Sequence, residues 1–189
     1  MIRIGILGDI GSGKSYVAES FGYPVFNADK EVSKLYRKNK KIFNKLKKIL
    51  PKYFNSYPIK KNDVIKAILV NLNNLKKIVK VVHLEIRKEM NFFLKKNKNR
   101  RVVILDIPLL LENKINKKND ILIFVQSQKL DISKRLKRRV NFNQKLLNRF
   151  RKLQLPLDYK KRKSHFVIKN NFTNKFIKRD VKHILKKVL

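Results

Sequence analysis

The sequence predicts an α/β fold in which the strands of a parallel sheet alternate with helices. Short runs of β-branched and other apolar residues recur along the chain, and stretches with apolar residues three or four positions apart separate them. Hydrophobic residues make up 43% of the 189 residues, which is enough for the core of a single domain. No apolar run reaches the roughly 18 residues that a membrane span requires.

The chain opens with a predicted strand, turn, helix and second strand. Residues Ile2–Leu7 are rich in β-branched side chains and end at Gly8, which indicates a buried strand. Residues 14–21 follow as a predicted helix, and Pro24–Phe26 as a short second strand. This order is typical of the first unit of an open parallel sheet.

A long helical segment follows, from about residue 30 to residue 98. Its apolar residues recur every three or four positions, which is the period of an amphipathic helix. The pattern is carried by Ile42, Leu46, Leu50, Val64, Ile68, Leu72, Leu75 and Ile78, and Pro51 and Pro58 bracket a break in it. We therefore expect a helical insertion over about residues 32–98, at the C-terminal edge of the sheet.

The second half of the chain returns to alternation. The runs RVVILD (101–106) and ILIFV (121–125) are continuously apolar, as is typical of parallel strands buried on both faces. Helices are expected at 129–139, 143–153 and 174–188, with a last strand at Phe166–Ile168. Together these elements predict a doubly wound parallel sheet with a helical insertion.

The composition limits the classes of function. Lys and Arg outnumber acidic residues 49 to 13, for a net charge of +36, but they are spread along the chain among Asn and Ile, as a general compositional drift would produce. We therefore do not expect a nucleic-acid partner, although the charge attracts polyanions such as phosphorylated small molecules. Cys is absent, which excludes disulfides and thiolate chemistry. The opening MIRIGILGDI is unlike a cleavable signal segment, so we expect a cytoplasmic protein without a membrane role.

A phosphate-binding motif lies between the first strand and the first helix. Residues Gly8–Ser15, GDIGSGKS, match G-x-x-x-x-G-K-[ST], and we call them the phosphate loop. There, backbone N–H groups and a helix N-terminus can surround a triphosphate. Lys14 is expected to reach the β- and γ-phosphates of ATP, and the Ser15 hydroxyl to bind Mg²⁺. The predicted ATP-binding residues are Gly8, Gly11, Ser12, Gly13, Lys14, Ser15 and Tyr16.

Acidic residues are scarce, so those near the ends of predicted strands stand out. Asp29 follows the second strand and Asp106 ends the third, and in an open α/β sheet the ligand lies at these carboxyl ends. Asp29 is a candidate base for an attacking hydroxyl, and Asp106 a candidate Mg²⁺ ligand. The alternative for Asp29 is the N-cap of a helix that begins near Lys30, with Asn27 as a rival cap. Glu112 is either part of the site or a surface charge on a turn.

Several motifs in order, over nearly the whole chain, resemble the dephospho-CoA kinase family. GILGDIGSGKS resembles the family's GLTGGIGSGKS, FNADKEVSKLY its DAD segment, with Asp29 as the second acid, and DIPLLLENK its (D/V)-P-L-L-x-E signature. VHLEIRKEM resembles its His-Pro-x-hydrophobic-Arg element, and HFVIKN its DxVIxN. Arg135, Arg139, Arg149 and Gln154 fall at the spacing of the family's lid and following helix.

This resemblance implies a P-loop NTPase-type fold, and transfer of the ATP γ-phosphoryl group to the ribose 3′-hydroxyl of dephospho-CoA, with Mg²⁺. The helical insertion would then hold the acceptor, and a lid at about 139–149 would close over the site. The catalytic residues implied are Asp29, Lys14 and Arg139. Arg149 and Asn170 are implied for ATP, and His83, Arg87, Pro108 and Leu109, with Asp29 and Arg139, for the acceptor.

The sequence departs from the family pattern at Asp9, Asn27, Leu84, Val140 and His165. Asp9 stands where the family has Gly, and its side chain is expected to point away from the loop. Two other readings stay open: a small P-loop kinase that acts on a nucleoside or nucleoside monophosphate, and a basic P-loop protein that binds RNA or DNA.

Overall fold

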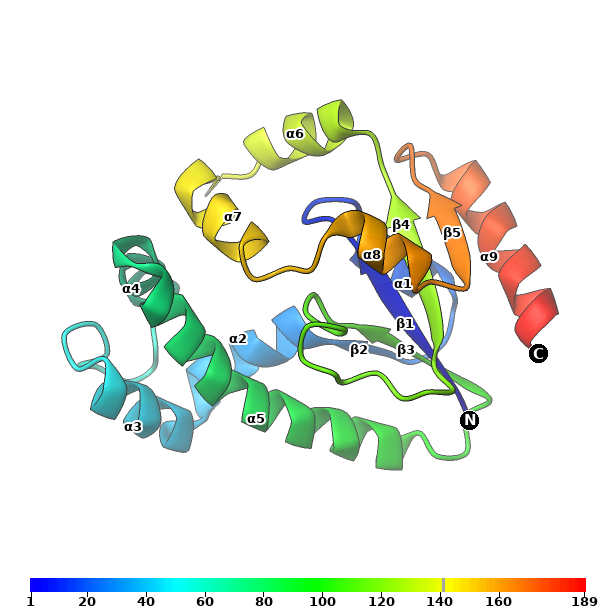
Figure 1. The fold of residues 1–189 in the computed structure, drawn as a ribbon. Helices are drawn as coiled ribbons and strands as arrows, with labels where there is room; N and C mark the ends of the chain where they lie inside the picture. The colour runs from blue at the N-terminus through cyan, green and yellow to red at the C-terminus, as the bar shows by residue number, and fades with distance from the viewer. Residues whose placement is uncertain (141) are drawn as a thin grey trace. The chain divides into compact units, whose positions relative to one another are not determined.

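The computed structural model describes residues 1–140 and 142–189, without the side chains of residues 174 and 175 (Figure 1). The strands are β1 (Ile2–Gly8), β2 (Val25–Asn27), β3 (Val102–Asp106), β4 (Ile121–Gln126) and β5 (Phe166–Lys169). The helices are α1 (Lys14–Ser20), α2 (Ala28–Lys38), α3 (Lys40–Ile49), α4 (Lys61–Val70), α5 (Leu72–Lys96), α6 (Lys129–Lys137), α7 (Gln144–Arg151), α8 (Leu157–Arg162) and α9 (Asn174–Val188).

The chain divides into two compact units. The first contains the sheet and comprises Met1–Asn27, Leu94–Phe142 and Leu153–Leu189. The second is helical and comprises Ala28–Phe93 and Asn143–Lys152. The phosphate loop and Asp106 therefore belong to the first unit.

The sheet is parallel, with strand order β2-β3-β1-β4-β5. Ile4 in the central strand β1 pairs with Ile104 on one side and Ile121 on the other. The chain builds one half of the sheet on each side of β1, so the loop after β1 lies at the point where the strand order reverses. In open α/β sheets, ligands bind at this point. The predicted α/β class and parallel sheet are confirmed.

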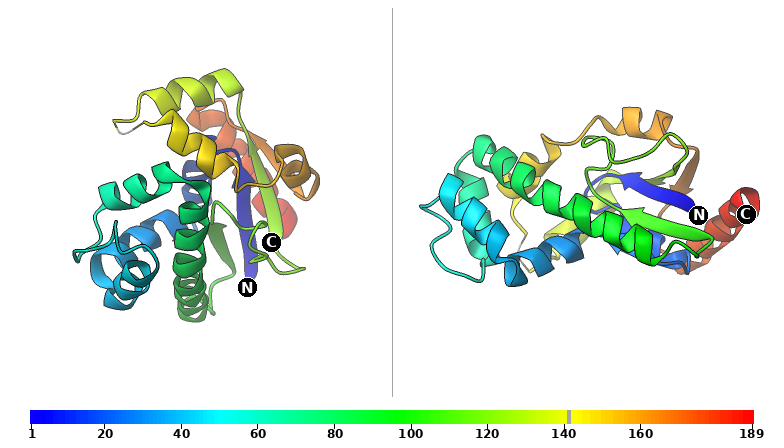
Figure 2. Two further views of the ribbon diagram at one scale, coloured as in Figure 1. Left: turned by 60° about the vertical axis from the view of Figure 1, so that its left-hand side comes forward. Right: turned by 90° about the horizontal axis from the view of Figure 1, so that it is seen from below.

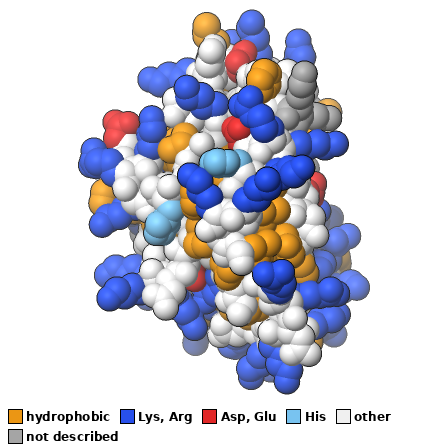
Figure 3. Space-filling model, turned by 90° about the vertical axis from the view of Figure 1, so that its right-hand side faces the viewer, with side chains coloured by type: hydrophobic (Ala, Val, Ile, Leu, Met, Phe, Trp, Pro, Cys, Tyr) orange, Lys and Arg blue, Asp and Glu red, His pale blue; other side chains and the backbone are white. Residues whose placement is uncertain are grey.

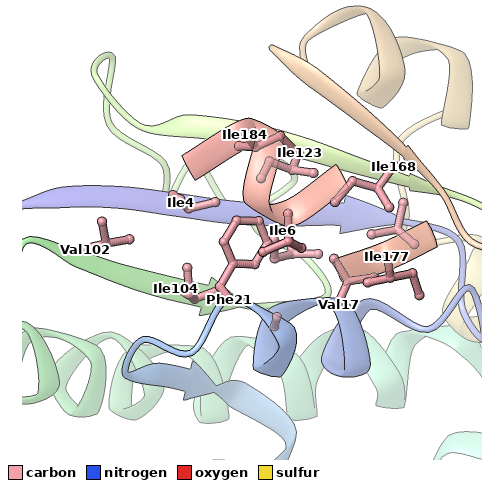
Figure 4. Packing of buried hydrophobic residues seen from close by; sticks show 13 residues of the cluster. Ile4, Ile6, Val17, Phe21, Val102, Ile104, Ile123, Ile168, Ile177 and Ile184 are labelled. Atoms are coloured by element: carbon pink, nitrogen blue, oxygen red, sulfur yellow. The ribbon is translucent and has the colours of Figure 1, made fainter. Parts of the chain in front are cut away.

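One face of the sheet packs against α1 and α9 (Figure 4). The buried cluster contains Ile4, Ile6, Val102, Ile104, Ile123, Val125 and Ile168 from the strands, Val17, Ala18 and Phe21 from α1, and Ile177, Val181 and Ile184 from α9. Burying one such large apolar side chain stabilises the fold by roughly 1.5–3 kcal/mol. The cluster thereby fixes α1, whose N-terminus ends the phosphate loop.

The other face of the sheet is covered in part by α8 and by the turns that follow β3. Leu110, in these turns, is fully buried, and it packs where β1 has Gly5. A Cβ at Gly5 would lie 2.5 Å from Cδ2 of Leu110, so this close approach requires glycine. The sequence did not predict α8, because its six residues LDYKKR show no apolar period.

The second unit contains α2, α3, α4, α7 and most of α5. Figure 2 shows α5 as one long helix. Asn side chains cap the starts of three of these helices, α3, α5 and α7. Asn39 accepts a hydrogen bond from the Ile42 N–H at 3.0 Å at the start of α3, and Asn143 accepts one from the Leu146 N–H at 2.8 Å at the start of α7. Such N-caps satisfy backbone donors that the first helical turn leaves unpaired.

The helical content predicted for about residues 30–98 is confirmed by α2–α5, and the break between Pro51 and Pro58 lies between α3 and α4. The boundaries of the insertion and of the lid stay predictions. Residue 141, inside the predicted lid at about 139–149, lies outside the described residues. The helix α7, which the lid was expected to include, packs on α4 in the second unit.

The surface carries the basic excess broadly. Figure 3 shows Lys and Arg side chains spread over the face that it presents, with few acidic ones among them. Over the part of the chain that the structure describes, no helix is long and apolar enough to cross a membrane.

Candidate active site

The phosphate loop joins β1 to α1 with three glycines at positive φ. Gly8, Gly11 and Gly13 have φ of 145°, 87° and 86°, values that residues with a Cβ rarely adopt. A Cβ on Gly8 would lie 2.6 Å from the Val125 carbonyl oxygen, and one on Gly13 would collide with the Asn170 amide. The loop can therefore pack closely against β4 and Asn170 only because these positions lack a Cβ.

The carbonyl group of Ser12 is held by the neighbouring strands. Asn170, just after β5, donates from Nδ2 to the Ser12 oxygen at 2.8 Å, and Ser127, just after β4, donates from Oγ at 3.0 Å. Asn170 is 2% exposed, and its Oδ1 accepts from the Phe172 N–H at 2.7 Å. Because the amide of Asn170 is fixed at both ends, it orients the centre of the phosphate loop.

Asp106, at the end of β3, faces the start of α1. The Ser15 hydroxyl donates to its Oδ2 at 2.5 Å, and the Asn27 amide, at the end of β2, donates to the same oxygen at 2.7 Å. Burial raises the pKa of the Asp106 carboxyl above its ordinary value of 3.8, against the opposing effects of the Ser15 hydrogen bond and the Lys14 charge. The predicted approach of Asp106 to the phosphate loop is confirmed.

The Ser15 hydroxyl and the Asp106 carboxylate form a small set of hard oxygen donors. Mg²⁺ prefers oxygen ligands and keeps several waters, so one carboxylate and one hydroxyl beside a triphosphate suit it. Groups of three or more His, Asp or Glu side chains that would hold a metal without a substrate are absent from the described residues. The residues present therefore fit Mg²⁺ that binds together with a nucleotide.

Lys14 and Asp9 both bond to the loop backbone. The Lys14 ammonium donates to the carbonyl oxygens of Asp9 at 2.7 Å and of Gly8 at 3.2 Å. The Asp9 carboxylate was expected to point away from the loop, but Oδ1 accepts from the Ile10 N–H at 2.7 Å. The carboxylate of Asp9, a departure from the family pattern, is therefore paired with a backbone N–H donor of the loop.

The helix α6 packs on the phosphate loop through Ile132 and Leu136, next to Gly11. The Arg135 guanidinium of α6 lies over the Phe172 ring, 4.3 Å from its centroid. Arg139 follows the end of α6 and is exposed. The Arg135 cation is therefore held beside Phe172, which lies next to Gly13 of the loop. The approach of Arg139 to the γ-phosphoryl group stays a prediction.

A cavity of about 630 Å³ opens beside the residues that hold Ser12. Its lining includes Gln126 at the end of β4, Ser127 and Gln128 after it, Asn170 and Asn171 after β5, and Phe176 of α9. The same two strand ends thus support the loop and border a space that a ligand can enter.

Asp29 lies in the first turn of α2, in the second unit. Because α2 begins at Ala28, Asp29 is inside the helix and is not its N-cap, so the capping alternative is wrong. Asn27, the rival cap, belongs to β2 and bonds to Asp106. The approach of Asp29 to the phosphate loop stays a prediction.

His83 and Arg87 lie one turn apart on α5. Among the described residues, Nε2 of His83 is buried without a hydrogen-bond partner. Burial lowers the pKa of His83 below its ordinary value of 6.5, and the positive charge of Arg87 lowers it further. The imidazole is therefore neutral near pH 7, with an unused ring nitrogen.

Arg149, predicted to bind ATP, lies on α7 and donates to backbone carbonyls at the end of α4. Its acceptors are the Ile68 and Val70 oxygens, the latter at 3.1 Å. A guanidinium suits this position because the last carbonyls of a helix lack partners within it. Its contact with ATP stays a prediction.

The turns after β3 contain Pro108 and Leu109, both partly buried, and Glu112. Glu112 is not the surface charge that one of its two interpretations predicts, because its side chain is only 8% exposed and pairs with Lys160 at 2.6 Å. Sequence reasoning missed Lys160, because a lysine in a polar segment of a basic chain carries no signal of burial.

A family model for dephospho-CoA kinase matches residues 2–175. The chain belongs to this family. It is 33% identical to the dephospho-CoA kinase of Wolbachia pipientis wMel over 187 residues, which cover 96% of this chain and 95% of that protein. The crystal structure of TT1252 from Thermus thermophilus aligns with a TM-score of 0.78 and 26% identity, covering 100% of this chain and 98% of that one. Dephospho-CoA kinase from Campylobacter jejuni shares the fold, with a TM-score of 0.61, 20% identity and coverage of 98% and 96%.

Two departures from the dephospho-CoA kinase pattern have a structural explanation. The Asn27 amide donates to Asp106, where a second carboxylate would repel it. The His165 ring accepts a hydrogen bond from the Leu122 N–H through Nδ1 at 3.0 Å. The backbone N–H of His165 donates to the Leu122 carbonyl oxygen at 2.8 Å. An Asp carboxylate can accept the same bond, so the exchange of Asp for His preserves an acceptor at this place.

We predict that Asn170→Asp weakens ATP binding, because it replaces the donor facing the Ser12 carbonyl with a second acceptor. The KM for ATP should rise about tenfold, which corresponds to about 1.4 kcal/mol. Steady-state kinetics at saturating acceptor measures it. Asn39→Asp is the matched control, because Asn39 accepts a bond and Asp can replace it as a cap. An unchanged KM in Asn170→Asp would contradict the role given to the amide.

We predict that the His83 imidazole titrates below pH 6.5 and that Arg87→Gln moves its pKa only part of the way back, because burial is the larger cause. NMR titration of the ring protons, assigned with His83→Gln, measures both values. Since the folded pKa is depressed, the unfolded chain binds more protons below pH 6.5, and stability falls as the pH drops through this range. His83→Gln should lose that part of the pH dependence. A His83 pKa at or above 6.5 would contradict the burial argument.

Proposed function

We propose that the chain transfers the γ-phosphoryl group of ATP to the ribose 3′-hydroxyl of dephospho-CoA, giving CoA and ADP. The observation that carries the proposal is the pairing of Ser15 with Asp106 beside the lysine of the phosphate loop, in a member of this kinase family. Phosphoryl transfer depends mainly on positioning the two substrates and on neutralising charge at the transferred group. The site offers groups for both tasks.

The phosphate loop binds ATP through its backbone N–H groups and the N-terminus of α1. Lys14 exchanges its bonds with the Gly8 and Asp9 carbonyls for the β- and γ-phosphates, and Tyr16 lies in the same helical turn. Asn170 acts by holding Ser12. Arg139 and Arg149 supply further cations, and a planar guanidinium suits the spread charge of the γ-phosphoryl group.

Ser15 and Asp106 would hold Mg²⁺ together with the nucleotide, and the bound ion would supply charge neutralisation at the phosphate oxygens. The chain's own contribution is to keep the Asp106 carboxylate in place, which the Asn27 amide does at 2.7 Å.

The acceptor is bound by the residues that the family resemblance implies for it. Asp29 takes the proton from the attacking 3′-hydroxyl. His83 offers a neutral ring nitrogen for a hydrogen bond, and Arg87 a fixed positive charge suited to the diphosphate of dephospho-CoA. Pro108 and Leu109 give the acceptor an apolar contact.

The reaction is tested by following ATP-dependent formation of CoA, with dephospho-CoA, adenosine and AMP compared at equal concentration. We expect kcat/KM for dephospho-CoA to exceed the others by about a hundredfold or more. Equal rates with adenosine or AMP would instead favour a general nucleoside or nucleotide kinase. Binding of a random oligonucleotide that persists at high salt would favour a nucleic-acid role, since nonspecific electrostatic binding collapses as salt rises.

We predict that Asp29→Asn lowers kcat about a hundredfold, because Asn cannot accept a proton at neutral pH. Stability should change by less than about 1 kcal/mol, the usual range for an acidic residue in the first turn of a helix. Kinetics and thermal unfolding measure the two effects. Asp63→Asn is the matched control, because Asp63 lies in the first turn of α4 and has no assigned role. Near-normal turnover in Asp29→Asn would contradict the role of a base.

A further inference from the structure

Glu112 and Lys160 form a buried ion pair in the first unit. Their oxygen and nitrogen lie 2.6 Å apart, and the two side chains are 8% and 1% exposed. Oε1 of Glu112 also accepts from the Leu155 N–H at 2.9 Å, and Lys160 donates to Oε1 of Gln154 at 3.2 Å. One carboxylate oxygen thereby ties the turns after β3 to the segment that leads into α8.

The turns after β3 need such a tie because they have no strand partner of their own. They begin at Asp106, which Ser15 and Asn27 hold, and they are anchored again at Leu110, packed against Gly5. Glu112 is the polar anchor two residues later. Pro108 and Leu109 therefore follow one fixed residue, Asp106, and precede two others in the chain, Leu110 and Glu112.

The pair is a poor means of stabilising the fold by itself. Removing two charges from water costs free energy that the attraction between them barely offsets, and apolar replacements of such pairs are often as stable. Among the described residues, Oε2 of Glu112 is buried without a hydrogen-bond partner, which adds to the cost. A directional pair does, however, favour one geometry, because the buried ammonium donates to both Glu112 and Gln154 and a shift of either segment would weaken these contacts.

We infer that Glu112 and Lys160 are positioning residues for the acceptor, which act by fixing Pro108 and Leu109. The inference rests on the proposed function, in which these two residues contact dephospho-CoA. Neither charged group touches the acceptor, since both are buried. The pair controls the affinity for the acceptor, while ATP, bound by the phosphate loop, is affected little.

The test compares Glu112→Gln, Lys160→Met and the double variant with wild type. Gln keeps the shape of Glu112 and loses its charge. Met keeps an unbranched chain, one atom shorter than that of Lys160, and lacks the charge. Lys161→Met is the matched control, since Lys161 is the next residue of α8 and is exposed. For each variant the KM for each substrate, the Kd for dephospho-CoA by calorimetry without ATP, and the melting temperature are measured.

We expect each single variant to raise the acceptor KM and Kd about tenfold, as a displaced contact does, with the ATP KM within about twofold of wild type. The double variant should regain melting temperature, because no buried charge is left unpaired, yet keep the weakened acceptor binding. Lys161→Met should match wild type in all measurements.

Three results would overturn the inference: acceptor binding that follows the melting temperature across the variants, equal weakening of ATP and acceptor, or no change in either. The first would make the pair structural only. Wild type that fails to phosphorylate dephospho-CoA would refute the proposed function, whereas an active wild type with unaffected variants would refute this inference alone.

Discussion

The two hydrogen bonds onto the Ser12 carbonyl connect the phosphate loop to the rest of the sheet. Asn170 and Ser127 donate them from the ends of β5 and β4, while the loop itself continues β1. A loop with glycines at positive φ has many accessible conformations, and these bonds select one of them. Together with the burial of α1 in the apolar cluster, this conformation keeps Ser15 beside Asp106.

Scarce carboxylates recur at buried positions in this very basic chain. Asp106 accepts from Ser15 and Asn27, Glu112 pairs with Lys160, and Asp120 pairs with Arg3 at 2.9 Å, with side chains 3% and 9% exposed. Each joins segments that are distant in the sequence. Surface cations are by contrast mostly solvated, and exposed ion pairs such as Lys34 with Glu31 contribute little to stability. The polar contacts that join distant segments are therefore made by a few buried acidic residues, and the many surface lysines add little to them.

Sequence patterns found the elements that have a strong period or a strong motif. The continuous apolar runs ending at Asp106 and beginning at Ile121 became strands buried on both faces, because such runs cannot be shielded in any other strand arrangement. The helix α8 was missed, because it is held by the single buried charge of Lys160 and not by an apolar stripe. The interpretation of Asp29 as a cap was wrong because the helix begins at Ala28, two residues before Lys30. Helix boundaries depend on local backbone geometry that sequence spacing does not resolve.

The sequence by itself determined the parallel α/β fold, the phosphate loop and the place of Asp106 beside that loop, because these follow from local periods and from the one edge at which parallel strands end. Only the tertiary structure decided that Asn170 orients the loop, that His83 keeps an unpartnered nitrogen in a buried setting, and that Glu112 is paired and not solvated. These properties depend on burial and on partners up to 158 positions away in the chain, and no local pattern records which distant side chain will supply the missing donor or charge.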